Sequence, residues 1–151
     1  MNRILTLAAA AVAAVVLLAP QPAQAYCVYN YTDGWSFRLI QRSNGGYMGT
    51  IGSAKGDRSC CNWEDGTCNR NGSRTAGVTL DLFGSKQDTS YTGGYKGLTG
   101  SCGYSASVEL QAGGWVEIYP GNDGTVSGDA HRKFHCIAYG VDGQVTGVWK
   151  P

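Results

Sequence analysis

The chain has 151 residues, among them 23 glycines and six cysteines. Its 12 basic and 11 acidic residues nearly cancel, and the densest basic stretch is the pair Arg132-Lys133. Proteins that bind nucleic acid normally carry a basic stripe or patch that neutralises phosphates. We therefore expect no nucleic-acid partner.

The N-terminal residues have the organisation of an export signal. Arg3 provides a positive charge, an apolar run extends to Pro20, and Ala23-Gln24-Ala25 matches a signal-peptidase site. A membrane anchor is the alternative, but the apolar run is shorter than the roughly 20 residues that a spanning helix needs. We predict a cleaved signal peptide over residues 1–25 and a single mature domain over residues 26–151. The mature protein is then secreted or periplasmic and retains no transmembrane segment.

Short apolar-alternating segments between glycine-rich turns predict an all-β domain of about eight strands. In chain order, the predicted strands are 27–31, 35–41, 47–51, 78–82, 104–111, 115–119, 134–141 and 144–149. Two segments without periodicity, 53–75 and 84–103, are predicted to be long loops. The Asp142-Gly143 dipeptide predicts a type I′ turn between the last two strands. The pattern is compatible with a small antiparallel β-sandwich and with a barrel-like domain.

The six cysteines are expected to form disulfides, because exported proteins meet an oxidising environment. Adjacent cysteines rarely bond each other, since their Cβ atoms diverge, so Cys60 and Cys61 should have different partners. We expect a short bridge that braces the loop 62–67 and two longer bridges. The predicted pairs are Cys61–Cys68, Cys60–Cys102 and Cys27–Cys136. The alternative is a zinc site built from Cys60, Cys61, Cys68 and a histidine, although the spacing matches no common zinc motif.

A predicted hairpin around Ala112-Gly113-Gly114 carries the candidate binding residues. A three-residue loop there keeps one face apolar, and this register places Glu109 opposite Glu117. Carboxylates beside outward aromatic rings suit sugar binding, whereas a covering loop or second sheet would make the same residues structural. The candidate binding residues are Glu109, Gln111, Trp115, Glu117 and Tyr119.

The favoured function is a binding or interaction module for a carbohydrate or protein partner outside the cytoplasm, without a cofactor. One alternative is a small secreted hydrolase that uses the Glu109/Glu117 pair or a histidine, either His131 or His135, oriented by Asp129. Another is a structural or inhibitory protein that acts through the loops 62–67 and 89–101. The oxygen-rich segment 122–129 is more typical of a turn than of a calcium site, so no metal is expected.

Overall fold

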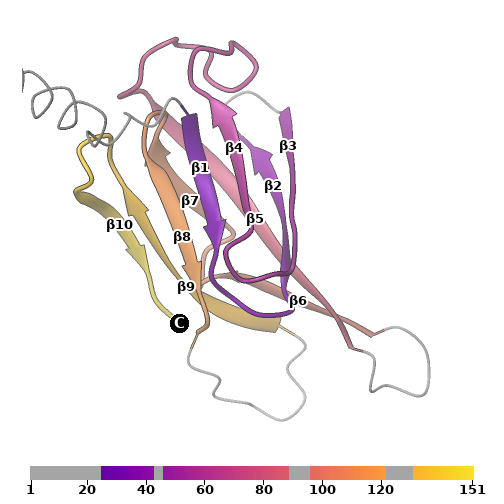
Figure 1. Cartoon of the computed structure of the whole chain (residues 1–151). Coiled ribbons are helices and arrows are strands. Elements are labelled where there is room, and N and C mark those ends of the chain that lie inside the picture. Colours follow the sequence, from indigo (N-terminus) through magenta and orange to yellow (C-terminus); the bar gives the residue numbers. More distant parts are fainter. Residues whose placement is uncertain (1–24, 43–45, 89–95, 122–130) are drawn as a thin grey trace, which may run out of the picture.

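The computed structural model describes residues 25–42, 46–88, 96–121 and 131–151 (Figure 1). Within these ranges the chain forms ten strands and no helix, which confirms the predicted all-β class. The strands are β1 (Ala25–Asn30), β2 (Ser36–Gln41), β3 (Gly46–Ile51), β4 (Arg58–Asn62), β5 (Gly77–Asp88), β6 (Lys96–Cys102), β7 (Ser107–Gln111), β8 (Trp115–Tyr119), β9 (His131–Tyr139) and β10 (Val145–Trp149). The export signal, most of the loop 89–101, the oxygen-rich segment and Asp129 lie outside the described residues.

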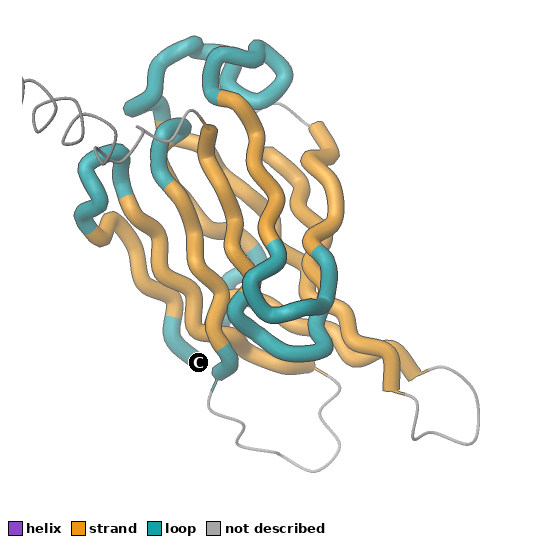
Figure 2. The backbone as a smooth tube through the Cα atoms, in the orientation of Figure 1, coloured by secondary structure: helices purple, strands orange, loops and turns teal. Residues whose placement is uncertain are grey.

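Eight strands form one continuous sheet in the order β3-β2-β5-β6-β9-β8-β1-β4. The two edge strands, β3 and β4, approach each other, so the sheet curls into a nearly closed barrel (Figures 1 and 2). Most neighbours are antiparallel, but β1–β8 and β6–β9 are parallel pairs. The remaining strands extend this sheet, with β7 paired to β5 and β10 paired to β9.

The barrel interior is filled by the apolar positions of the alternating strands. Leu39, Leu80 and Ile118 are fully buried there. At one end of the core, the Phe134 ring packs edge-on against Trp35 and Phe37, with ring centroids 4.8 Å and 5.0 Å apart. These residues follow the period-two patterns of the sequence, because burial of one face fixes the register of a strand.

The three disulfides correct two of the predicted pairings. Cys61–Cys68 forms as predicted and closes the loop 62–67. The predicted bridges Cys27–Cys136 and Cys60–Cys102 are wrong, because the structure contains Cys27–Cys60 and Cys102–Cys136. All six cysteines are therefore bonded as disulfides, and the alternative zinc site has no thiolate ligands.

Strand geometry explains both corrections. Cys27 lies directly opposite Cys60 in the antiparallel pair of β1 and β4, on the outer face of the sheet. Cys102 and Cys136 point into the barrel, where they are 1% and 0% exposed. Cys27 and Cys136 thus face opposite sides of the sheet, and a disulfide cannot join side chains that diverge in this way. The prediction that Cys60 and Cys61 have different partners is confirmed, since neighbours on a strand point to opposite faces.

Two strands lie within segments that were predicted to be loops. β4 falls within 53–75 and has the polar sequence Arg-Ser-Cys-Cys-Asn, which lacks an apolar alternation. β6 falls within 84–103 and has the sequence Lys-Gly-Leu-Thr-Gly-Ser-Cys, which also lacks an apolar alternation. Both strands are held by backbone pairing and by disulfides rather than by a buried apolar row. Hydrophobic periodicity, the main signal for strands, is therefore absent from them.

The terminal hairpin forms as predicted, but its turn is not type I′. β9 and β10 are antiparallel neighbours, and the N–H of Gly143 donates to the carbonyl of Gly140 at 3.0 Å. A type I′ turn needs positive φ at both central residues, whereas among the described residues only glycines have positive φ. Gly143, with φ of 78°, follows the turn and returns the chain into β10.

Candidate functional site

The predicted hairpin of residues 104–119 is wrong, and this changes the candidate site. β7 pairs with β5, whereas β8 pairs with β1 and β9. The segment Ala112–Gly114 therefore crosses between two parts of the barrel instead of turning a hairpin. At Gly114 a Cβ atom would overlap the carbonyl oxygen of Tyr139, so only glycine fits this crossing. β7 and β8 both bury every second residue, and this pattern does not reveal which strand each of them pairs with.

Two predicted binding residues are consequently separated from the other three. Glu109 is exposed on β7 and lies opposite Thr79, not opposite Glu117. Gln111 accepts a hydrogen bond from the backbone N–H of Val141 at 3.0 Å, which ties the end of β7 to the β9–β10 turn. Glu109 and Glu117 do not face each other, and Gln111 has a structural contact.

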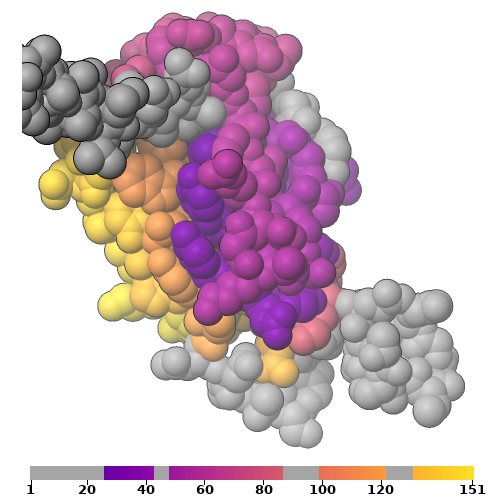
Figure 3. All heavy atoms as spheres, viewed as in Figure 1, coloured from indigo at the N-terminus to yellow at the C-terminus, as the bar shows by residue number. Residues whose placement is uncertain are grey.

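Trp115, Glu117 and Tyr119 remain together on the outer face of β8, where each side chain is partly exposed. Figure 3 views this side of the molecule, on which β10, β9, β8, β1 and β4 follow one another across the sheet. The registers with β1 and β9 place Tyr29 and Ile137 on either side of Glu117, Tyr139 beside Trp115, and His135 beside Tyr119. We call this surface the aromatic face, and it consists of Tyr29, Tyr31, Trp115, Glu117, Tyr119, His135 and Tyr139.

The Glu117 carboxylate lies at the centre of the aromatic face and accepts hydrogen bonds from its neighbours. The indole N–H of Trp115 donates to Oε1 at 3.2 Å, and the hydroxyl of Tyr119 donates to Oε2 at 2.7 Å. The hydrogen bond to Glu117, together with burial and the nearby negative charge, raises the pKa of Tyr119 well above its ordinary value. Burial, followed by the negative charge of Glu117, also raises the pKa of Tyr139. These phenols therefore stay neutral and act as donors.

The aromatic rings are packed against one another in two stacks. Trp115 and Tyr139 are stacked with centroids 4.7 Å apart, and Tyr31 and Tyr119 with centroids 5.1 Å apart. Tyr29 extends the second stack, 6.4 Å from Tyr31. Each stacked ring has one face against its neighbour, so packing fixes its rotamer. The sequence pattern placed Trp115 and Tyr119 outward, but it missed the tyrosines of β1 and β9 because it does not reveal strand order.

The two histidines occupy different surroundings. His135 packs edge-on near Tyr119, with centroids 6.4 Å apart, and its Nε2 is buried without a hydrogen-bond partner among the described residues. His131 begins β9, where its Nε2 lies 2.9 Å from the Ser101 hydroxyl and its Nδ1 lies 3.1 Å from that of Thr99. Four residues along one strand span about 13 Å, too far for both rings to hold one ion. No group of three or more metal-ligating side chains occurs among the described residues.

A separate pocket of about 240 Å³ lies at the end of the barrel beside Trp35 and Phe134. Its remaining lining residues are Thr32, Asp33, Lys86, Pro120, Gly121 and Arg132. None of the predicted binding residues lines it, so the aromatic face and this pocket are distinct features.

Comparisons with known protein families, with curated proteins and with solved structures found no match to this chain. In the part of the chain that the structure describes, no helix is long and apolar enough to cross a membrane. The function must therefore be argued from the aromatic face itself.

Proposed function

We propose that the mature chain is an extracellular binding module that takes carbohydrate on the aromatic face. The observation that carries this proposal is the group of partly exposed, mutually stacked rings around the Glu117 carboxylate. Three disulfides support an oxidising compartment, where such bonds persist. The export signal and its cleavage after Ala25 belong to the same proposal.

The preformed stacks favour binding because little side-chain freedom remains to be lost. Tyrosine and tryptophan offer large apolar surfaces with polar tips, and fixed rotamers reduce the entropic cost of association. A sugar presents the complementary combination of C–H surfaces and hydroxyl groups. The tyrosine hydroxyls and the Glu117 carboxylate supply donors and acceptors to those hydroxyls.

The size of the aromatic face favours a short glycan over a protein as the primary ligand. Neighbouring strands are about 4.8 Å apart and outward residues about 6.8 Å apart, so three strands with three outward positions each span about 10 Å by about 14 Å. A standard protein interface buries about 800 Å² on each partner, which is far more than this grid offers. A protein partner would have to contact much of the surrounding surface as well.

Hydrolysis by the Glu109/Glu117 pair is not supported. Two-carboxylate glycosidases require the acids on either side of the scissile bond, about 5–10 Å apart. Glu109 and Glu117 lie on strands that pair with different neighbours, and Glu109 lies on the outer surface of β7. Binding without turnover is therefore the function that the geometry supports best.

A glycan array followed by isothermal titration calorimetry tests this proposal. We expect the exported protein to bind at least one glycan class and Trp115→Ala to weaken that binding at least about tenfold, equivalent to about 1.4 kcal/mol. Tyr104→Ala is the matched control, because Tyr104 is 81% exposed and lies outside the aromatic face. Equal affinity of the Trp115→Ala variant and the wild type would rule out the aromatic face as the binding surface.

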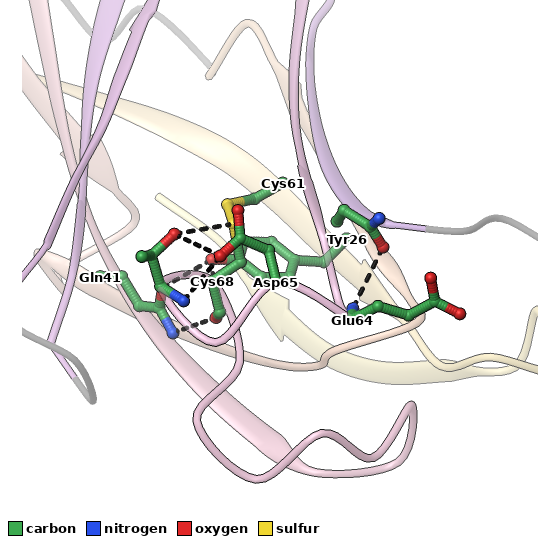
Figure 4. The surroundings of a disulfide bond; sticks show 8 residues. Tyr26, Gln41, Cys61, Glu64, Asp65 and Cys68 are labelled. Carbon is green, nitrogen blue, oxygen red and sulfur yellow. Dashed lines mark hydrogen bonds between the residues drawn. A yellow bond between two sulfur atoms is a disulfide. The ribbon is translucent and has the colours of Figure 1, made fainter.

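The loop 62–67 supports a second candidate function, contact with a protein. Figure 4 shows how the Cys61–Cys68 bridge and its neighbours brace this loop. The carbonyl of Cys68 accepts hydrogen bonds from Gln41 Nε2 at 2.5 Å and from the Tyr26 hydroxyl at 3.3 Å. A rigid, exposed loop of this kind suits an inhibitor. Replacing residues 64–67 with glycine and serine would abolish capture of such a partner and leave glycan binding unchanged.

A further inference from the structure

We infer that the aromatic face recognises a protonated amine on its glycan, that is, an amino sugar whose nitrogen is not acylated. This inference rests on the proposed function and names the class of sugar. It follows from the charge of Glu117 and from the neutral side chains that surround it.

Glu117 carries a negative charge without a cationic partner among the described residues. The side chains that hydrogen-bond to it are both aromatic, Trp115 and Tyr119. The nearest cation in register is Arg58, which lies beyond Tyr29 on β4. Two strand spacings separate the backbones of Arg58 and Glu117, about 10 Å, and no ion pair joins the two side chains among the described residues.

The carboxylate has acceptor capacity left for a ligand. An ionised carboxylate offers about four lone-pair sites, and the hydrogen bonds from Trp115 and Tyr119 use two of them. A cation that reaches a remaining site gains a charge-assisted hydrogen bond. Partial burial of Glu117 strengthens this attraction, because the surrounding rings displace part of the water that would otherwise screen it.

The aromatic rings add a second attraction that is specific to cations. Tryptophan and tyrosine faces attract ammonium groups through the ring quadrupole, and cages of aromatic rings hold quaternary ammonium ligands in this way. The same chain already uses this interaction elsewhere, since the Lys133 ammonium lies 3.6 Å from the centroid of the Tyr104 ring. A neutral sugar would gain the ring contacts but would leave the Glu117 charge without a counter-ion.

Calorimetric titrations of the exported protein with three tetrasaccharides test the inference. The probes are a β-1,4-linked glucosamine tetramer, its fully N-acetylated form and a β-1,4-linked glucose tetramer. We expect the glucosamine tetramer to bind at least about tenfold more tightly than the other two, as a charge-assisted contact implies. We also expect its affinity to fall as salt is raised, whereas the affinities of the neutral tetramers stay constant.

Glu117→Gln should remove the preference for the glucosamine tetramer over the two neutral tetramers, and with it the salt dependence of glucosamine-tetramer binding. Glu109→Gln is the matched control, because it removes the same charge from the exposed outer surface of β7. The salt dependence of wild-type binding tests the inference even if Glu117→Gln is poorly folded. Equal, salt-independent affinity for the three tetramers would overturn the amine inference and leave the carbohydrate proposal standing. Absence of binding to all three, together with a negative glycan array, would overturn both.

Discussion

Asn30 is the buried polar residue whose removal tests the fold most sharply. It is 0% exposed at the end of β1, next to Tyr31 of the aromatic face. Its Nδ2 donates to the carbonyls of Trp35 and Gly52 at 2.7 Å and 2.9 Å. Its Oδ1 accepts from the backbone N–H and the hydroxyl of Thr32 at 3.0 Å and 2.6 Å. All four hydrogen-bonding positions of the side chain are therefore used.

Asn30→Ala leaves buried partners without hydrogen bonds. The N–H and hydroxyl of Thr32, which is 1% exposed, and the carbonyl of Trp35 lose their partner, whereas the exposed Gly52 can bind water. Each unsatisfied buried group costs at least about 1 kcal/mol, so three groups predict a loss of at least about 3 kcal/mol. For a domain of this size, that loss lowers Tm by at least about 10 °C.

Urea unfolding monitored by tryptophan fluorescence measures this loss. Asn62→Ala is the matched control, because exposed Asn62 accepts one hydrogen bond, from the N–H of Glu64, and its loss should cost no more than about 1 kcal/mol. If Asn30→Ala costs as little as the control, the network around Asn30 does not hold this corner and the reasoning is refuted.

Three further predictions concern the bridges, the crossing and the tyrosines. The double variant Cys27→Ala/Cys60→Ala removes a bridge with a sequence separation of 33 and should lower the free energy of unfolding by about 4 kcal/mol. Removing the Cys61–Cys68 bridge, with a separation of 7, should lower it by about 2.5 kcal/mol. Denaturant unfolding compares the two variants, and equal losses would argue against the loop-entropy explanation. Gly114→Ala should prevent folding or destabilise strongly, whereas Gly77→Ala, with open space around its Cβ, should be tolerated in a thermal melt. The pKa of Tyr119 is raised in the folded state, so its neutral hydroxyl stabilises the fold. This contribution to the free energy of unfolding is complete below the ordinary tyrosine pKa of about 10 and is lost as the pH rises toward the pKa of the folded state. The fall in unfolding free energy between about pH 9 and about pH 11 should therefore be smaller in Tyr119→Phe, and an unchanged slope would contradict the raised pKa.

The strands that bury an apolar row could be predicted from the sequence, and the others could not. Leu80 and Ile118 lie in clear period-two patterns, and burial follows from that period. β4 and β6 are held by backbone hydrogen bonds and disulfides, which leave no periodic signal in the sequence. The adjacent cysteines predicted correctly that Cys60 and Cys61 have different partners, because neighbouring residues of a strand point to opposite faces. Which cysteine each of them bonds depends on the order of the strands in the sheet, which the sequence does not reveal.

The candidate site was predicted in part for the same reason. Alternation along β8 placed Trp115, Glu117 and Tyr119 on one outer face, and this is where they lie. The neighbours of β8 are β1 and β9, strands that are distant in the sequence. A local hairpin rule therefore supplied Glu109 as a neighbour, whereas the fold supplies Tyr29 and Tyr139.

Nuclear magnetic resonance of the ¹⁵N-labelled protein tests the central claim most directly, because the indole N–H of Trp115 contacts Glu117. On titration with a glycan identified by the array, the account predicts that the indole signal of Trp115 and the amide signals of β1, β8 and β9 shift together. The indole signal of Trp35, which is 8% exposed in the core, should stay in place. Shifts confined to β7 or to the loop 62–67, with the Trp115 signal unmoved, would contradict the assignment of the aromatic face as the binding surface.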